Sequence, residues 1–268
     1  MTTGDFFRSA WVWRPVAAAG CMAILAVYAA FVRFRFGVRS AAFFAGVALV
    51  ALALFSPMAA LADNYLFSVH MARHILLVLV VPALLVSGLP SEPVRRVLRC
   101  SAPARIERTL RTPAIAWTAG IGAMAFWHIP AVFNAALASG PLHMLEELSM
   151  LLAGTIYWWP ILSPVAEHRL RPIPEAAAYL FVSCLACTAI GIVITFAPPP
   201  LYTPYAAPRD PYGILTTIRG GWGISPALDQ QIGGVLMWVP CCFVYLTAIM
   251  AMFARWYGEE EKYEPVRN

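Results

Sequence analysis

Residues 65–88 read YLFSVHMARHILLVLVVPALLVSG, and beyond the first turns this stretch is apolar throughout. A helix needs about 20 mainly apolar residues to cross the hydrocarbon core of a bilayer. The rest of the 268-residue chain has the same character, because 60% of it is hydrophobic and only 12% is charged. Soluble domains are about 25% charged. The sequence therefore predicts an integral membrane protein.

Seven segments of the chain reach spanning length. Their apolar runs are long and lack strict alternation, which favours helices over a β-barrel. The connections are short except two, a basic loop at 90–112 and a Pro-rich loop at 198–228. We therefore predict one all-α domain over residues 1–268, a polytopic membrane helical bundle of seven transmembrane helices at 11–31, 41–62, 65–88, 113–137, 142–163, 174–197 and 229–255.

Positive charge is distributed unevenly among the connections. Most of the 19 Lys and Arg residues follow the first, third, fifth and seventh segments, including Arg33, Arg35 and Arg39 after the first and Arg267 near the end. By the positive-inside rule, the N-terminus lies outside and the C-terminus is cytoplasmic. The net charge of +5 then matches anionic lipid headgroups, so no nucleic acid partner is needed to explain it.

The two long loops receive different interpretations. The basic loop is expected to be a cytoplasmic topological anchor, with a short amphipathic helix on the membrane surface as the less favoured alternative. The periplasmic Pro-rich loop is either a lid or docking surface over the helix ends, or an interfacial loop with no role beyond packing. Its aromatic residues Tyr202, Tyr205, Tyr212 and Trp222 suit an interfacial position.

Four of the five histidines lie at segment ends that the predicted topology brings to the outer side. His70 and His74 are at i and i+4, so they share one helix face. His128 precedes Pro130, which should kink its segment, and His143 begins the next one. Ionisable groups inside a span usually point into the bundle and carry function. The pattern predicts a metal site open to the periplasm, although a lone histidine could simply bond a neighbouring helix.

Other polar and sulfur-bearing side chains are expected at the same end, whereas few occur at the opposite one. Imidazoles suit several transition metals, and thioethers select Cu(I), so the mixture favours copper, as Cu(I). The methionines could instead be packing residues, the adjacent glutamates a helix N-terminal charge pair, and the arginine a partner for a carboxylate. The candidate assisting ligands, or groups that orient the ligands, are Met71, Met144, Met237, Glu146, Glu147, Asp229, Gln230, Asp63 and Arg73.

The six cysteines do not form a disulfide framework of the extracellular kind. Cys184 and Cys187 lie in the middle of one predicted span, and Cys241 and Cys242 in the middle of another. Opposed thiols at that depth could hold Cu(I), but small packing residues are the favoured interpretation.

The chain resembles the seven-span CtaG family, the assembly factors of caa3-type cytochrome c oxidase. The stretches that carry the resemblance are HMARH at 70–74, WHIP at 127–130 with Phe133-Asn134, HMLE at 143–146 with WWP at 158–160, and DQQIGG at 229–234 with Met237-Trp238. They extend from about the second predicted span to the seventh.

The resemblance implies a multi-pass protein of the bacterial plasma membrane that is needed to make active haem-copper oxidase, with a role in copper supply. The family's histidines correspond to His70, His74, His128 and His143. Its acidic and amide positions correspond to Glu146, Asp229 and Gln230. This chain has no obvious His-rich or Met-rich tail for gathering copper, so the source of any metal stays open.

We therefore expect a copper-binding assembly factor with no turnover of its own. It would accept copper at the outer face, from a periplasmic donor if there is one, and pass it to a cytochrome c oxidase subunit. The main alternative is a haem-binding or quinol-linked membrane redox protein whose histidines are axial ligands. A metal or proton transporter is a third hypothesis, but the inner halves of the spans offer few polar groups to line a path.

Overall fold

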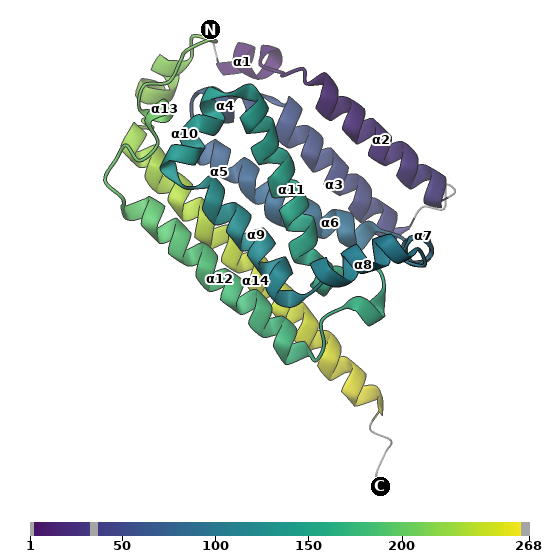
Figure 1. Ribbon diagram of the computed structural model, residues 1–268. Helices are drawn as coiled ribbons and strands as arrows, with labels where there is room; N and C mark the ends of the chain where they lie inside the picture. Colours follow the sequence, from purple (N-terminus) through teal and green to yellow (C-terminus); the bar gives the residue numbers. More distant parts are fainter. Residues whose placement is uncertain (1–2, 33–36, 264–268) are drawn as a thin grey trace.

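The computed structural model describes residues 3–32 and 37–263, and every regular element in these ranges is a helix (Figure 1). Arg33, Arg35, Arg267 and the C-terminus, which the orientation prediction uses, lie outside the described residues. The helices are α1 (Thr3–Ser9), α2 (Pro15–Val32), α3 (Val38–Phe55), α4 (Pro57–Asn64), α5 (Phe67–Ile75), η1 (Leu76–Val80), α6 (Val81–Gly88), α7 (Ser91–Val97), α8 (Ser101–Leu110), α9 (Pro113–Trp127), α10 (Pro130–Ala138), α11 (Gly140–Leu162), η2 (Ala166–His168), α12 (Ile173–Phe196), α13 (Thr203–Ala206), η3 (Thr217–Gly221) and α14 (Pro226–Tyr263).

Among the described residues, five helices are long and apolar enough to cross a membrane, or six if the bent pair α9–α10 counts as one span. The chain is thus an all-helical, multi-pass membrane protein. Helix α11 has spanning length but is not among these, because His143, Glu146 and Glu147 lower its hydropathy. The seventh span and the orientation of the termini therefore stay predictions.

Two predicted spans are broken by proline. The segment predicted at 41–62 ends as α3 at Phe55, where the Ser56 side chain accepts a hydrogen bond from the Met58 amide at 3.2 Å and Pro57 starts α4. Proline suits the first turn of a helix because it lacks an amide hydrogen. The segment predicted at 113–137 bends by 74° between α9 and α10, where Pro130 begins the second helix.

The continuous segment α5–η1–α6 lies at the centre of the bundle. In the most apolar 18-residue stretch of this segment 61% of the residues are buried, against 6% in the peripheral helix α2. Helix α14 packs against α5 on one side, and α11 packs against η1 and α6 on the other (Figure 1). The histidines of α5 therefore face other helices instead of lipid.

Two glycines allow the neighbouring helices to approach this central segment. A Cβ at Gly154 of α11 would collide with the Val78 carbonyl oxygen and lie 2.7 Å from Pro82 Cγ. A Cβ at Gly233 of α14 would collide with the Phe67 ring. Only glycine fits at such backbone approaches, so these two positions set the spacing around the metal-binding candidates.

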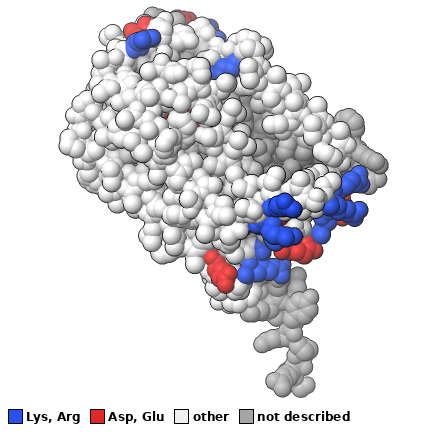
Figure 2. Space-filling view, in the orientation of Figure 1, with Lys and Arg blue, Asp and Glu red and all other residues white. Residues whose placement is uncertain are grey.

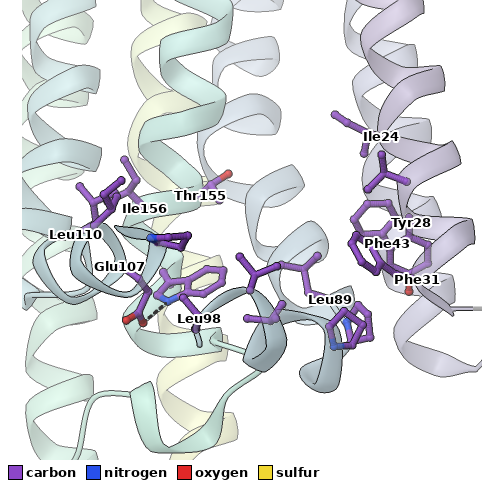
Figure 3. Close-up of a pocket in the computed structure, with 18 of the residues that line it drawn as sticks. Ile24, Tyr28, Phe31, Phe43, Leu89, Leu98, Glu107, Leu110, Thr155 and Ile156 are labelled. Carbon is purple, nitrogen blue, oxygen red and sulfur yellow. Dashed lines mark hydrogen bonds between the residues drawn. The ribbon is translucent and has the colours of Figure 1, made fainter. Parts of the chain in front are cut away.

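The basic loop 90–112 forms two short helices, α7 and α8, and its role as a topological anchor or as a membrane-surface helix stays a prediction. Figure 2 shows most of the visible Lys and Arg at this end of the molecule. An apolar cavity of about 800 Å³ lies between α2, α3, α7, α8 and α11. Figure 3 shows its main polar feature, the Glu107 carboxylate, which accepts a hydrogen bond from the Trp159 indole at 3.0 Å. Because the lining of this cavity is apolar, it does not offer the side chains that a metal site needs.

Candidate metal centre

Helix α5 is held in place by a carboxylate from another helix. Asp229 of α14 accepts hydrogen bonds from the Phe67 amide at 2.8 Å, the Ser68 amide at 3.0 Å and the Ser68 hydroxyl at 2.6 Å. It thereby satisfies donors that the first turn of a helix leaves free. Asp229, a candidate ligand by sequence, is thus engaged in anchoring the helix that carries the histidines.

His70 and His74 face each other one turn apart on α5, both essentially inaccessible to solvent. Their Nε2 atoms lie 2.8 Å apart, and their ring centroids 4.4 Å apart. A hydrogen bond between two imidazole nitrogens needs a proton on one and a lone pair on the other. At least one of the two Nε2 atoms therefore offers a lone pair.

Glu146 of α11 lies beside this pair and is fully buried. Its Oε1 is 3.3 Å from His74 Nε2 and 3.8 Å from His70 Nε2, and neither carboxylate oxygen has a hydrogen-bond partner within the described structure. A buried charge without a partner is costly. Metal bonds to imidazole and carboxylate are about 2.0–2.2 Å long, so ligand atoms up to about 4.4 Å apart can share an ion. These three atoms meet that condition.

His128 adds a fourth imidazole at the break between α9 and α10. Its Nδ1 lies 2.6 Å from the Met124 carbonyl oxygen, and its Nε2 lies 3.2 Å from Met71 Sδ. A carbonyl only accepts hydrogen bonds, so Nδ1 carries the proton and Nε2 keeps a lone pair toward the interior. The His128 ring is 5.3 Å from that of His74. The soft thioether of Met71 therefore lies next to the imidazole of His128.

Two arginines and two carboxylates form a network above the histidines, which we call the arginine–carboxylate network: Arg14, Arg73, Asp63 and Glu147. Arg73 is fully buried and donates to Asp63 at 2.5 Å, and it lies 3.3 Å from Glu147. Arg14 donates to Asp63 at 2.6 Å and to Glu147 at 2.7 Å. Burial raises the pKa of Asp63, but Arg73, His143 and Arg14 outweigh it and hold that pKa below its usual value.

His143 lies between this network and the buried pair. Arg73 Nη2 donates to His143 Nε2 at 2.7 Å and is 3.1 Å from His70 Nδ1. The His143 ring stacks 5.6 Å from that of His70, and its side chain keeps 12% of its surface exposed. The same Nε2 lies 3.8 Å from Glu146 Oε2. His143 is therefore the outermost histidine of the four, and its lone pair is engaged by Arg73.

The Pro-rich loop covers the histidines from above. Tyr205 donates its hydroxyl to the Ala62 carbonyl at 2.6 Å and lies 3.0 Å from His70 Nδ1, while the Tyr202 hydroxyl donates to the His128 carbonyl at 2.9 Å. Both side chains are buried. These two rings pack within the protein because each hydroxyl finds an acceptor inside the bundle, and the interfacial depth expected for the loop stays a prediction.

Gln230 of α14 ties the same loop down. Its Nε2 donates to the Ile194 carbonyl at 3.1 Å and the Ala197 carbonyl at 2.9 Å, and its Oε1 accepts from the Leu201 amide at 2.8 Å. This candidate from the sequence thus joins the end of α12 to the loop. Its polar atoms are occupied there and do not face the imidazoles.

The remaining two sequence candidates differ in exposure. Met144 is 45% exposed on the outside of α11, and Met237 is fully buried in α14, one turn from Cys241. Sequence reasoning did not single out Arg14 or assign Tyr202 and Tyr205 to the site. In the sequence, Arg14 is recognisable only as an isolated charged residue near the start of the first apolar segment.

Comparison with known proteins identifies a family to which this chain is similar. The model of the cytochrome c oxidase caa3 assembly factors matches residues 11–259. A curated protein of Mycobacterium leprae (strain TN), described as uncharacterized, is 23% identical over 212 residues, which are 74% of this chain and 31% of that protein. The chain thus spans about a third of the length of this relative. No solved structure matches the chain.

Proposed function

Because the chain belongs to the cytochrome c oxidase caa3 assembly factors, we propose that it carries copper to the oxidase, with His70, His74 and Glu146 as the principal ligands. The observation that supports this is the Glu146 carboxylate, which is buried 3.3 Å from His74 Nε2 and has no hydrogen-bond partner among the described residues. A cation between these atoms would neutralise the carboxylate and occupy the imidazole lone pairs.

The side chains around these three ligands favour monovalent copper. Imidazoles bind several metals, but a thioether adds preference for Cu(I), and Met71 Sδ lies 3.2 Å from the His128 lone pair. A single positive charge also balances the single negative charge of Glu146, which lowers the cost of burying the ion. His128 and Met71 can therefore receive or release copper next to the principal ligands.

Residues that bond the ligand histidines without touching the ion would keep the imidazole rings in the protonation state that metal binding needs. If His70 Nε2 binds the ion, its proton must move to Nδ1. The Tyr205 oxygen, whose own proton is directed to Ala62, lies 3.0 Å away and can accept it. Hydrogen bonds of this kind fix the tautomer and orientation of a ligand histidine. Arg73 Nη2, which lies 3.1 Å from His70 Nδ1 and can only donate, would then keep only its hydrogen bond to His143.

Copper would enter and leave on the periplasmic side. Figure 2 shows the basic end at α7 and α8, and the positive-inside rule assigns such an end to the cytoplasm. The N-terminus and the histidines then face the periplasm, where a copper donor and an oxidase subunit of the bacterial plasma membrane would dock. The protein would transfer copper by ligand exchange and catalyse no reaction of its own.

The geometry does not favour the haem alternative. The imidazoles pack against one another, with ring centroids 4.4 Å apart for His70 and His74, 5.3 Å for His74 and His128, and 5.6 Å for His70 and His143. A haem needs its two ligand rings on opposite faces of a macrocycle. An absorption spectrum of the purified protein without a Soret band is the expected result.

Copper binding under anaerobic, reducing conditions tests the proposal. We expect the His70→Ala, His74→Ala double variant to lose one copper equivalent and the ability to support assembly of active oxidase. The control is His168→Ala, which removes a histidine that bonds Glu107 at the basic end. Equal copper binding by the double variant and the wild type would overturn the proposal.

A further inference from the structure

Two pairs of thiols join α12 to α14, and we call them together the thiol cluster: Cys184 with Cys242, and Cys187 with Cys241. Cys184 Sγ is 2.7 Å from Cys242 Sγ, and the fully buried Cys187 and Cys241 lie next to each other. All four are free cysteines. From this juxtaposition we propose that the thiol cluster holds a second copper site, in which Cys187 and Cys241 bind Cu(I) through sulfur.

The spacing of the sulfur atoms suits a shared ion. Metal–thiolate bonds are about 2.3 Å long, as in zinc sites, so two sulfurs on one ion lie within about 4.6 Å of each other. Met124 of α9 adds a thioether, with its Sδ 3.7 Å from Cys187 Sγ. Cys187 and Cys241 are fully buried, so the ion would have only protein ligands. Sulfur ligands of this kind select Cu(I) over harder cations.

Binding requires each ligating thiol to lose its proton, so two thiolates on one Cu(I) release two protons and leave one negative charge. Hydroxyl groups around the thiol cluster can stabilise that charge. The Tyr245 hydroxyl lies 3.8 Å from Cys187 Sγ, and the Thr188 hydroxyl lies 3.4 Å from Cys242 Sγ. The Tyr157 hydroxyl is buried without a hydrogen-bond partner within the described structure. Its ring lies 6.1 Å from that of Tyr245.

One residue connects the thiol cluster to the histidines. Met124 contacts Cys187 through its sulfur, and its carbonyl accepts the proton of His128 Nδ1 at 2.6 Å. His128 Nε2 in turn faces Met71 Sδ. The two sites therefore adjoin but share no ligand, and the thiol cluster does not depend on the proposed function of the histidines. It would hold a second Cu(I) deeper in the bundle.

The test is the copper stoichiometry and X-ray absorption spectrum of the full-length protein, loaded with Cu(I) under anaerobic, reducing conditions. We expect the wild type to bind two copper ions. The His70→Ala, His74→Ala variant should keep one, with only sulfur neighbours. The Cys187→Ser, Cys241→Ser variant should also keep one, with nitrogen and oxygen neighbours. The matched control is Cys21→Ser plus Cys100→Ser, two cysteines outside the thiol cluster, which should keep both ions.

The histidine variant makes the proposal falsifiable even if the cysteine variant fails to fold. A spectrum of that variant without sulfur neighbours, or its complete loss of copper, overturns the second site. Undiminished copper binding by a folded Cys187→Ser, Cys241→Ser variant does the same. A histidine variant that keeps both ions contradicts the proposed function instead, so the two failures are distinguishable.

Discussion

The hydroxyl of Tyr205 lies 3.0 Å from Nδ1 of His70, although the two residues are 135 positions apart in the sequence. Tyr205 belongs to the Pro-rich loop, and His70 belongs to the central helix α5. The loop therefore reaches into the bundle and bonds one of the candidate metal ligands directly. The choice between a lid or docking surface and a loop that only packs stays open, because these contacts fit both interpretations.

Removing this hydroxyl should weaken both the fold and the metal site. In Tyr205→Phe the buried Ala62 carbonyl loses its donor, and an unsatisfied buried group costs about 1–3 kcal/mol. Loss of an outer partner of a ligand histidine lowers metal affinity by about 10–100-fold. Thermal unfolding and a competitive Cu(I) titration measure the two effects. The control is Tyr257→Phe, which removes a hydroxyl from a side chain 62% exposed on α14; equal effects of both variants would contradict this role.

The two adjacent glutamates of α11 should behave in opposite ways. Glu146→Gln removes a buried charge whose oxygens accept no hydrogen bond from any described residue, so the metal-free protein should be at least as stable as the wild type. Its copper affinity should fall by about 100-fold or more, because a ligand is lost.

Glu147→Gln instead weakens the ion pairs to Arg14 and Arg73. We expect the free energy of unfolding to fall by about 2 kcal/mol, the scale of a hydrogen bond to a charged group. Unfolding of the metal-free variants in the same detergent compares them. If Glu146→Gln is the more destabilising change, Glu146 holds the fold and not an ion.

Gly154 should be intolerant of even one extra carbon. In Gly154→Ala the new Cβ meets the Val78 backbone and Pro82, and overpacking costs about 1–3 kcal/mol. Because α11 must then move away from η1, Glu146 should shift relative to the α5 histidines and copper affinity should fall. The matched control is Gly122→Ala in α9, where the nearest atom is Thr118 Cγ2 at 3.8 Å. That change should stabilise the helix by about 0.5–1 kcal/mol, and a similar gain at Gly154 would contradict the close approach.

The Pro-rich loop should depend on pH through Asp210. Partial burial raises the pKa of this carboxyl, but hydrogen bonds from the Tyr65 hydroxyl and the Ile214 and Leu215 amides outweigh it and hold the pKa below its usual value. A carboxylate whose folded pKa is depressed stabilises the fold above its unfolded pKa of about 3.9 and loses that contribution as the pH falls through the folded pKa.

Wild type should therefore be more stable than Asp210→Asn at pH 6, and the difference should shrink toward pH 3. Thermal unfolding of both proteins across this range measures it. Tyr65→Phe, which removes one of the donors to Asp210, should lie between them at pH 6. A difference that stays constant with pH would show that the charge of Asp210 plays no part.

Much of the helix pattern was predictable from the sequence, because hydropathy is a property of consecutive residues. Each of the seven predicted segments contains helix in the structure. The breaks at Ser56–Pro57 and between Trp127 and Pro130 were less predictable, since a proline in an apolar run can start a new helix or merely kink the old one. The gathering of the four histidines was also predictable from the sequence, because each lies at a segment end that the predicted topology brings to the same side.

Only the tertiary structure decided which polar groups face one another. Asp229 and Glu146 are both buried acids in apolar helices, yet Asp229 caps α5 with three hydrogen bonds while Glu146 lies unpartnered beside His70 and His74. The reason is that the rotation of a helix about its own axis, and the loop that covers its end, depend on packing between segments far apart in the chain. The sequence alone determined where along each helix the histidines, acids and thiols occur, and the packing of the helices determined which of them could share an ion.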